Sequence, residues 1–184
     1  MKAWHFLRED GKLRDGKKPP KPGKVLKHKG DLIICCSGLH ASRKPLDALA
    51  LSPGPIICCV EVGGVIIEGD DKLVATERTI LWRYNCTDVL WHFARLCALD
   101  VIHLWDAPDV VIKYLKTGDE SLRAASWDAS WAASCDASRA ASWDASCDAS
   151  WAVSCDASRA ARRAASWAAQ NKRLYRLLMK GRPE

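Results

Sequence analysis

The sequence lacks the long apolar runs of a membrane protein and the local motifs of many catalytic sites. No stretch of about 18 consecutive apolar residues occurs in the 184 residues, so no transmembrane span is expected. The first residues lack the apolar core of a secretory signal peptide, so we expect an intracellular, reducing location. There is also no P-loop, Gly-x-Gly-x-x-Gly, His-Glu-x-x-His or nucleophile elbow. These absences leave no enzyme class indicated by a local motif.

Zinc-type cysteine spacing is also missing, although the chain has nine cysteines. None of them forms a Cys-x-x-Cys pair, so no metal or other cofactor is expected. Two adjacent pairs, Cys35-Cys36 and Cys58-Cys59, lie in β-prone stretches. Because neighbouring side chains of a strand point to opposite faces, we interpret both pairs as small core residues.

Basic residues concentrate at the two ends of the chain. Residues 1–30 hold ten Lys and Arg against three acidic residues, and residues 159–184 hold eight against one. Residues 31–158 hold ten against eighteen, so basic ends flank an acidic centre. Such polarity favours head-to-tail contacts or binding to a polyanion, and nucleic acid is one possible partner. A solvated basic arm and a basic helix end explain the same pattern without a partner.

The first two thirds of the chain predict an α+β domain over residues 1–116. A mobile, basic loop rich in Pro and Gly is expected at residues 8–30. We expect a small twisted sheet, with the helices of the domain concentrated toward its C-terminal end. We expect a turn over 37–42, a turn at Gly63-Gly64 between two strands, and Thr87 as a helix N-cap. The expected strands cover 3–7, 31–36, 55–62, 65–68, 73–75 and 79–82, and the expected helices 45–51, 87–98 and 108–115.

A four-residue unit, Ala-Ser-(Trp/Cys/Arg)-(Asp/Ala), repeats from Ser126 to Ser158. Within a second region of residues 117–184, it predicts one long helix from about 118 to 180, because alanine is the best helix former. The pattern from Thr117 to Glu120 resembles a capping box, and Gly181 stands where a C′ glycine is expected. A β-solenoid and a disordered segment remain alternatives for so short a repeat. Codons for Trp, Arg and Cys differ by one base, so the repeat cysteines are interpreted as drifted positions: Cys135, Cys147 and Cys155.

The period of the repeat predicts self-association. At about 100° per residue, each repeat of four advances about 40° around a helix, so its tryptophans cannot share one face. Neighbours on two sides would bury them. A second apolar patch near the C-terminus anchors the helix on its own domain or on a partner. The expected homo-oligomer interface comprises Trp127, Trp131, Trp143, Trp151, Trp167, Leu174, Leu177 and Leu178.

Three residues of the N-terminal domain have the order found in the ADP-ribosyltransferase superfamily. His5 lies on the first strand, Ser42 follows Gly38-Leu39-His40-Ala41, and Glu61 lies on a later strand. The stretch from about residue 3 to residue 80 therefore resembles that superfamily. The resemblance implies NAD binding, with His5 on the nicotinamide ribose, Ser42 in the nicotinamide pocket and Glu61 stabilising the oxocarbenium charge. Gly63 stands where the superfamily has a companion to the glutamate, which is a departure from its pattern.

Most of the chain is also similar to uncharacterised proteins of tailed bacteriophages. The residues that carry this similarity are Trp4-His5-Phe6-Leu7, the stretch 38–42, Val60-Glu61-Val62 and the repeat. It implies a viral protein in the host cytoplasm or the virion. We expect a non-enzymatic protein that oligomerises through its C-terminal helix and displays the small domain to a host or phage protein. An NAD- or nucleotide-binding protein and a nucleic-acid-binding protein are the alternatives.

Overall fold

The computed structural model describes residues 1–104, 106–130, 132 and 156–182. The chain divides into two compact units, one formed by Met1–Leu90 together with Gln170–Glu184 and the other by Trp91–Ala169. The expected α+β fold class is confirmed. The division differs from the boundary expected near residue 116, because the chain leaves the first unit after Leu90 and returns to it at Gln170. The repeat is therefore an insertion into the first unit rather than a tail appended to it.

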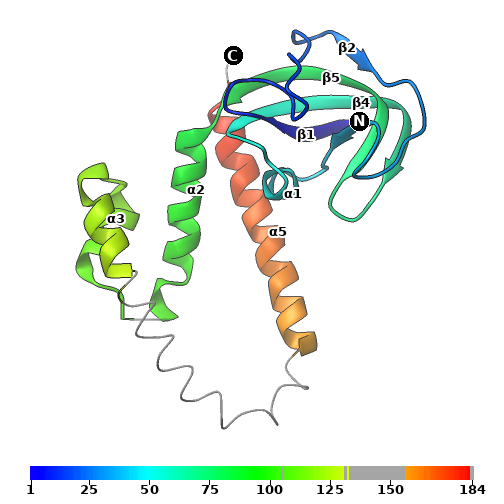
Figure 1. The fold of residues 1–184 in the computed structure, drawn as a ribbon. Coiled ribbons are helices and arrows are strands. Elements are labelled where there is room, and N and C mark those ends of the chain that lie inside the picture. Colours follow the sequence, from blue (N-terminus) through cyan, green and yellow to red (C-terminus); the bar gives the residue numbers. More distant parts are fainter. Residues whose placement is uncertain (105, 131, 133–155, 183–184) are drawn as a thin grey trace. The chain divides into compact units, whose positions relative to one another are not determined.

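An antiparallel sheet forms the first unit (Figure 1). Its strands have the order β1-β4-β5-β2, and β3 pairs with β5 beyond that path. The long hairpin of β4 and β5 is the centre of the sheet, since every other strand pairs with one of its two arms. The strands are β1 (Lys2–Leu7), β2 (Val25–Lys27), β3 (Leu39–Ala41), β4 (Ile56–Glu68) and β5 (Leu73–Asn85).

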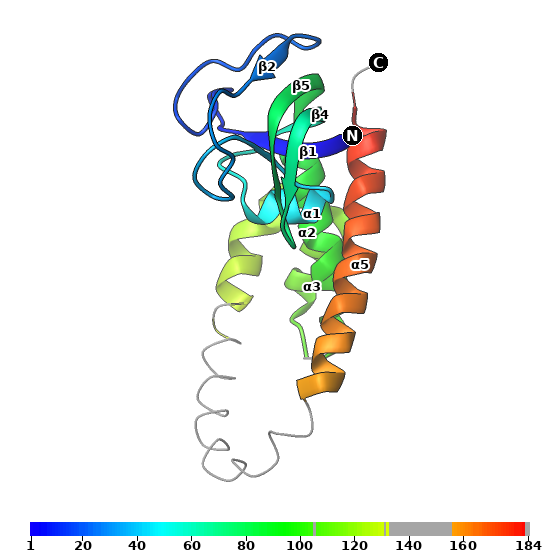
Figure 2. The same ribbon diagram turned by 90° about the vertical axis from the view of Figure 1, so that its right-hand side faces the viewer.

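Two hydrogen bonds close the pairings into a ring. The Trp4 amide donates to the Ser42 carbonyl at 2.8 Å, and the Ser42 amide donates to the Trp4 carbonyl at 2.9 Å. These bonds join β1 to the residue that follows β3, so the sequence of pairings β1-β4-β5-β3 returns to β1. Figure 2 shows β1 crossing beside the β4–β5 hairpin. A closed ring protects edges that an open sheet would expose.

A bulge replaces the turn that we expected at Gly63-Gly64. β4 runs through both glycines, and its register with β5 shifts between Gly63 and Ile66. Gly64 has a φ of +70°, and a Cβ there would lie 2.1 Å from the Thr76 hydroxyl oxygen. The prediction of a turn was wrong because a left-handed glycine can form a bulge within a strand as readily as it can end one. The bend lets one hairpin pair with β1 and β3.

The loops before β4 also differ from expectation. The expected strand at 31–36 is a turn closed by an isolated bridge between Ile33 and Ser37, and β3 lies where we expected a turn. Residues 8–30, which we expected to form a loop, contain β2, which pairs with β5, and several further backbone hydrogen bonds. For example, the His28 amide donates to the Thr76 carbonyl at 2.8 Å.

One hydrophobic cluster of the core lies on the inner face of the sheet. On β1 this inner face carries Ala3 and Leu7, and on β4 it carries Cys58, Val60 and Val62, all buried. The burial of Cys58 and Cys59 confirms the interpretation of that pair as core residues. Cys35 and Cys36 are instead exposed, so the same interpretation was wrong for them.

The C-terminal part of α5 (Asp156–Lys180) packs on the first unit (Figure 1, red). Leu174 and Leu178 are fully buried, and the Tyr175 ring meets the Trp4 ring edge-on with centroids 5.8 Å apart. The Tyr84 hydroxyl donates to the Leu178 carbonyl at 2.8 Å. Leu174 and Leu178 are therefore part of an intrachain anchor and are not free for the oligomer interface expected of them. Leu177 is half-buried.

Asn171 caps a helix that lies far from it in the sequence. Its carboxamide oxygen accepts a hydrogen bond from the Leu46 amide at 2.9 Å, and both residues are buried. Leu46 is the second residue of α1 (Pro45–Ala50), whose N-cap residue, Lys44, makes no side-chain cap. Because the first amides of a helix have no partner within it, Asn171 supplies the acceptor that the local sequence lacks.

The second unit, with most of α2, is helical. We predicted a single helix that begins at about residue 118. The predicted start was wrong, because Gly118 has a φ of 69° and ends α3. The Thr117 hydroxyl donates to the Lys113 carbonyl and accepts from the Asp119 amide, and Asp119, not Thr117, is the N-cap of the 3-10 turn that follows. Residues 123–130 are helical, while 133–155 lie outside the described residues. The elements are α2 (Thr87–Asp100), a 3-10 turn (Ile102–Leu104), α3 (Asp109–Thr117) and a 3-10 turn (Glu120–Leu122).

The ends of two helices also bear on the sequence predictions. At the start of α2, the Asn85 carboxamide accepts hydrogen bonds from the amide and hydroxyl of Thr87, so Asn85 takes the capping role expected of Thr87. At the C-terminus, α5 ends at Lys180 as expected, although Gly181 does not adopt a left-handed φ. None of the helices in the described part of the chain has the length and hydropathy needed to cross a membrane.

Candidate anion-binding site

A nearly buried arginine lies on the inner face of the sheet. Arg78 belongs to β5 and is only 5% exposed. Its guanidinium donates one hydrogen bond, from Nη1 to the His40 carbonyl at 2.5 Å, and takes part in none of the ion pairs found among the described residues. Burial lowers the pKa of Arg78 to about 10, so the side chain stays cationic near neutral pH. A buried cation without a carboxylate is costly unless an anion completes its hydrogen bonds.

His5 adds a second group with unmet hydrogen bonding. It lies between Ala3 and Leu7 on the inner face of β1, and its Nε2 is buried without a partner among the described residues. Burial is the main cause that lowers the pKa of His5 well below 6.5, and the positive charges of Arg78 and Arg14 contribute in the same direction. The ring is therefore neutral at pH 7.

His40 links the turn before β3 to Arg78. Its carbonyl accepts the Arg78 hydrogen bond, and its Nε2 accepts one from the Cys35 amide at 3.0 Å. Burial lowers the pKa of His40, and the charges of Arg78 and Lys72 contribute in the same direction. The ring is thus held as a neutral acceptor that fixes the local backbone.

The neighbours of this site share one sign of charge. The charged side chains that shift the pKa of His5, Arg78 and Arg14, are basic, and so are those that shift the pKa of His40, Arg78 and Lys72. An arginine fork binds the oxygens of phosphate or carboxylate in pairs, and a neutral imidazole can donate one further hydrogen bond. The arrangement therefore suits an anion of several oxygens. We call Arg78, His5 and His40 the cationic site.

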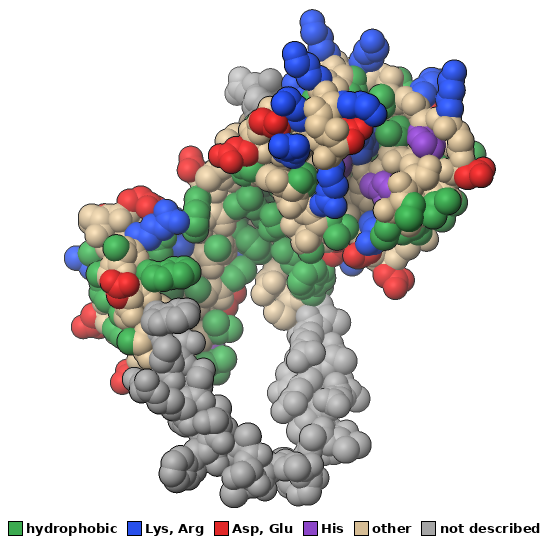
Figure 3. All heavy atoms as spheres, in the orientation of Figure 1, with side chains coloured by type: hydrophobic (Ala, Val, Ile, Leu, Met, Phe, Trp, Pro, Cys, Tyr) green, Lys and Arg blue, Asp and Glu red, His purple; other side chains and the backbone are tan. Residues whose placement is uncertain are grey.

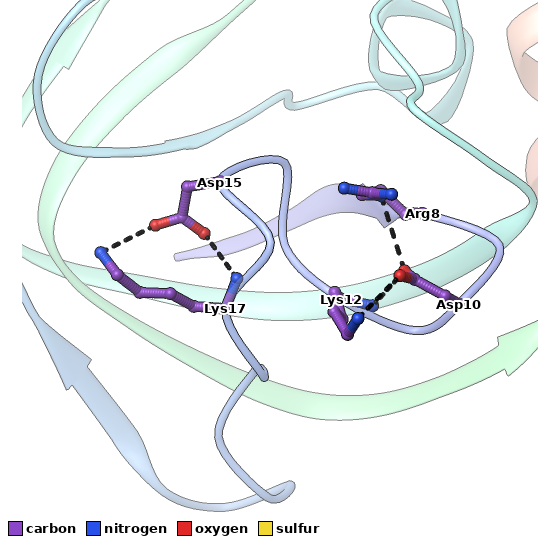
Figure 4. A network of polar contacts seen from close by, with 5 residues as sticks. All are labelled: Arg8, Asp10, Lys12, Asp15 and Lys17. Carbon is purple, nitrogen blue, oxygen red and sulfur yellow. Dashed lines mark hydrogen bonds and ion pairs between the residues drawn. The ribbon is translucent and has the colours of Figure 1, made fainter.

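The basic segment at residues 8–30 contributes less positive charge than its composition suggests. Figure 3 shows blue Lys and Arg side chains gathered over it, with red acidic groups between them. Figure 4 shows that Asp10 contacts Arg8 and Lys12 while Asp15 contacts Lys17. The Lys12 and Lys17 hydrogen bonds lower the pKa of these two carboxyl groups. A fourth pair joins Lys27 to Glu77 at 2.8 Å.

Three residues were expected to form a nucleotide site. The structure places His5 and Glu61 on neighbouring strands but on opposite faces, and it places Ser42 beside Trp4. His5 lies opposite Cys58, whereas Glu61 lies opposite Lys2. Because His5 and Lys2 are three residues apart on a strand, His5 and Glu61 lie on opposite faces. Glu61 is exposed. Ser42 is buried beside Trp4, where its backbone closes the ring of strands.

Arg78 was missed at the sequence level, whereas His40 was noted in the stretch 38–42 but interpreted as a turn residue. The sequence did contain a signal for Arg78. It is a charged residue two positions before the buried Ile80, and side chains two positions apart on a strand point to the same face. Of the expected interface tryptophans, Trp127 is 71% exposed and Trp167 is 42% exposed. Trp131, Trp143 and Trp151 lie outside the described residues.

The described residues contain no group of three or more His, Cys, Asp or Glu side chains placed to hold a metal ion. A hollow of about 500 Å³ lies among Arg8, Glu9, Asp10 and Pro53, and it includes no member of the cationic site. The cationic site is thus the most distinctive polar feature of the first unit.

No curated protein and no solved structure matches the chain. One protein family does, described as a domain of unknown function (DUF7666), and it matches residues 1–95. The match covers more than half of the chain and includes His5, His40 and Arg78, whereas the anchoring residues of α5 fall beyond it. The chain therefore belongs to the DUF7666 family.

Proposed function

We propose that the first unit binds a small phosphate-bearing ligand at the cationic site. The observation that carries this proposal is the guanidinium of Arg78, which is buried and has, among the described residues, a single hydrogen bond and no carboxylate partner. The unpartnered Nε2 of His5 supports it, because a phosphate oxygen would accept its hydrogen. Nucleotides are the biological class of such ligands to test first.

The burial of Arg78 favours a small ligand over a nucleic-acid strand. A polymer backbone meets side chains that project into solvent, whereas Arg78 is 5% exposed. The lysines and arginine that do project nearby are partly neutralised by Asp10 and Asp15. A non-covalent binding role is the simplest interpretation of the site, since Glu61 faces away from His5 and no carboxylate of the described residues contributes to the pKa of His5.

Calorimetric titration at constant ionic strength tests the proposal. The full chain is titrated with inorganic phosphate, tripolyphosphate, ADP and NAD, with sodium sulfate as a non-phosphate anion. We expect saturable binding of at least one phosphate compound, lost in Arg78→Met and retained in Arg43→Met. Arg43 is a suitable control because it is exposed and pairs with Glu68. Absence of binding by every phosphate compound would contradict the proposal, and equal binding by Arg78→Met would place the site elsewhere.

Self-association is a second candidate function, favoured by the tryptophans of the insertion. The Trp127 indole is 71% exposed, and a partner that covered it would bury a large apolar surface. A second copy of the chain offers the same exposed groups, Trp127 and Trp167. Light scattering after size exclusion tests this candidate. A particle larger than one chain that shifts toward the monomer in Trp127→Gln supports it, and a monomer at micromolar concentration contradicts it.

A further inference from the structure

The tetrapeptide Ile-Ile-Cys-Cys occurs twice in the first unit, in two different environments. Cys58 and Cys59 are buried on β4, whereas Cys35 and Cys36 are exposed in the turn before β3. The local sequence cannot explain a difference in chemistry between the two pairs, because it is the same. Any difference must come from the fold, which makes the buried pair an internal control for the exposed one.

A tight turn presents the exposed pair to solvent. Ile33 and Ser37 exchange two backbone hydrogen bonds, of 2.9 and 2.8 Å, so the two cysteines lie in the three-residue tip between them. Cys35 has a φ of 70°, a left-handed conformation that a residue with a side chain adopts at a cost. The bond from its amide to His40 Nε2 holds it there.

A cation lies beside the first of these thiols. Hydrogen bonding to Cys35 is the largest cause that raises the pKa of the Lys72 ammonium, followed in the same direction by the charge of Asp71. The thiolate is the form of a cysteine that attacks a disulfide. Low-molecular-weight disulfides such as oxidised glutathione carry carboxylates, so the same ammonium attracts them. Cys36 is next in the chain and exposed, and can attack a sulfur bound to Cys35.

We propose that Cys35 and Cys36 form a thiol–disulfide exchange site for a low-molecular-weight, anionic disulfide. The Cys35 thiolate attacks one sulfur of the disulfide R–S–S–R, the S–S bond breaks, and R–S⁻ leaves. Cys36 then loses its proton to solvent and attacks the Cys35 sulfur, so that a second R–S⁻ leaves and a Cys35–Cys36 disulfide remains. The two thiols are oxidised and the added disulfide is reduced to two thiols.

The product is expected to be readily reversible. Consecutive Cα atoms lie about 3.8 Å apart across a trans peptide, below the usual range of about 4.4–6.8 Å for disulfides. A disulfide between neighbours is therefore strained, and strained, exposed disulfides are the easily reduced ones. The redox state of Cys35 and Cys36 would thus follow the ratio of small thiols to small disulfides in the surrounding solution. This inference is independent of ligand binding at the cationic site.

Peptide mapping of the full chain tests the proposal with oxidised glutathione as the probe. Tryptic peptide 30–43 contains only Cys35 and Cys36, and peptide 44–72 contains only Cys58 and Cys59. We expect peptide 30–43 to gain glutathione and then to convert to a form lighter by two hydrogens, which excess glutathione reverses. Peptide 44–72 should stay reduced until the chain is unfolded, and its protection in each sample shows that the variant is folded.

Variants separate the roles of the residues. Cys36→Ser should accumulate the glutathione adduct on Cys35 without forming the disulfide. Lys72→Met should slow adduct formation roughly tenfold, while Lys21→Met, at an exposed lysine outside the turn, should not. Because Lys72→Met removes a tryptic site, peptide 44–78, which also contains only Cys58 and Cys59, replaces peptide 44–72 in that variant. Equal modification of the two peptides in the folded chain, an unmodified peptide 30–43, or an adduct that resolves normally in Cys36→Ser would each overturn the proposal.

Discussion

Replacing Arg78 with methionine separates a functional role for this residue from a structural one. The pKa of about 10, against about 12.5 for arginine in water, corresponds to a burial cost of about 3 kcal/mol. Methionine removes that cost and keeps most of the apolar stem. It also removes the charged hydrogen bond to the His40 carbonyl, which contributes about 1.5–3 kcal/mol. The two effects nearly cancel, so we expect the free energy of unfolding to change by less than about 2 kcal/mol.

Urea unfolding with and without tripolyphosphate measures both roles in one assay. A ligand at 100 times its Kd raises the free energy of unfolding by about 2.7 kcal/mol, and Arg78→Met should lose that increment. An arginine that held the fold through a buried ion pair would instead cost about 3–5 kcal/mol on removal. A loss of that size in Arg78→Met, with the ligand increment intact, would refute the assignment of Arg78 as a ligand-binding residue.

Three further predictions concern the fold and its pH dependence. Asn171→Ala should lower the free energy of unfolding by about 1–3 kcal/mol in denaturant titrations, because it leaves the Leu46 amide buried without an acceptor; an unchanged midpoint would contradict the cap. The folded pKa of His5 lies below 6.5, so the unfolded chain binds the extra proton and stability should fall with decreasing pH below about 6.5, by at most about 1.4 kcal/mol per pH unit for this group. His5→Gln should flatten that slope in urea titrations between pH 5 and 7, and an unaltered slope would show that His5 is not the group responsible. Gly64→Ala should destabilise the sheet by at least about 1 kcal/mol in thermal unfolding, since a Cβ there meets Thr76 and the φ is left-handed; a variant as stable as the parent would argue against the bulge.

The sequence predicted best what depends on local pattern. The strand at β1 and the helices α1 and α2 follow from alternation, a Pro at the first helical position and an apolar stripe. The same local rules mistook the paired glycines of β4 for a turn, because whether a glycine ends or bends a strand depends on the strand opposite. Cys35-Cys36 and Cys58-Cys59 show the limit most plainly, since identical tetrapeptides have opposite exposure.

The features of the fold and of the candidate site that the sequence did not predict depend on contacts between residues far apart in the chain. Nothing near Leu46 indicates that its cap comes from Asn171, or that Leu174 and Leu178 return to the sheet that begins the chain. The candidate site follows the same rule. His5 was singled out from its position on the first strand, but its closeness to Arg78 depends on which strands pair.

Nuclear magnetic resonance of the His5 ring, recorded during a pH titration with and without tripolyphosphate, tests the cationic site most directly. A bound anion opposes the positive charges of Arg78 and Arg14, which now lower the pKa of His5. The account predicts that tripolyphosphate raises the pKa of His5 in the parent chain and leaves it unchanged in Arg78→Met. Ring resonances of His5 that titrate identically with and without tripolyphosphate in the parent chain would contradict it.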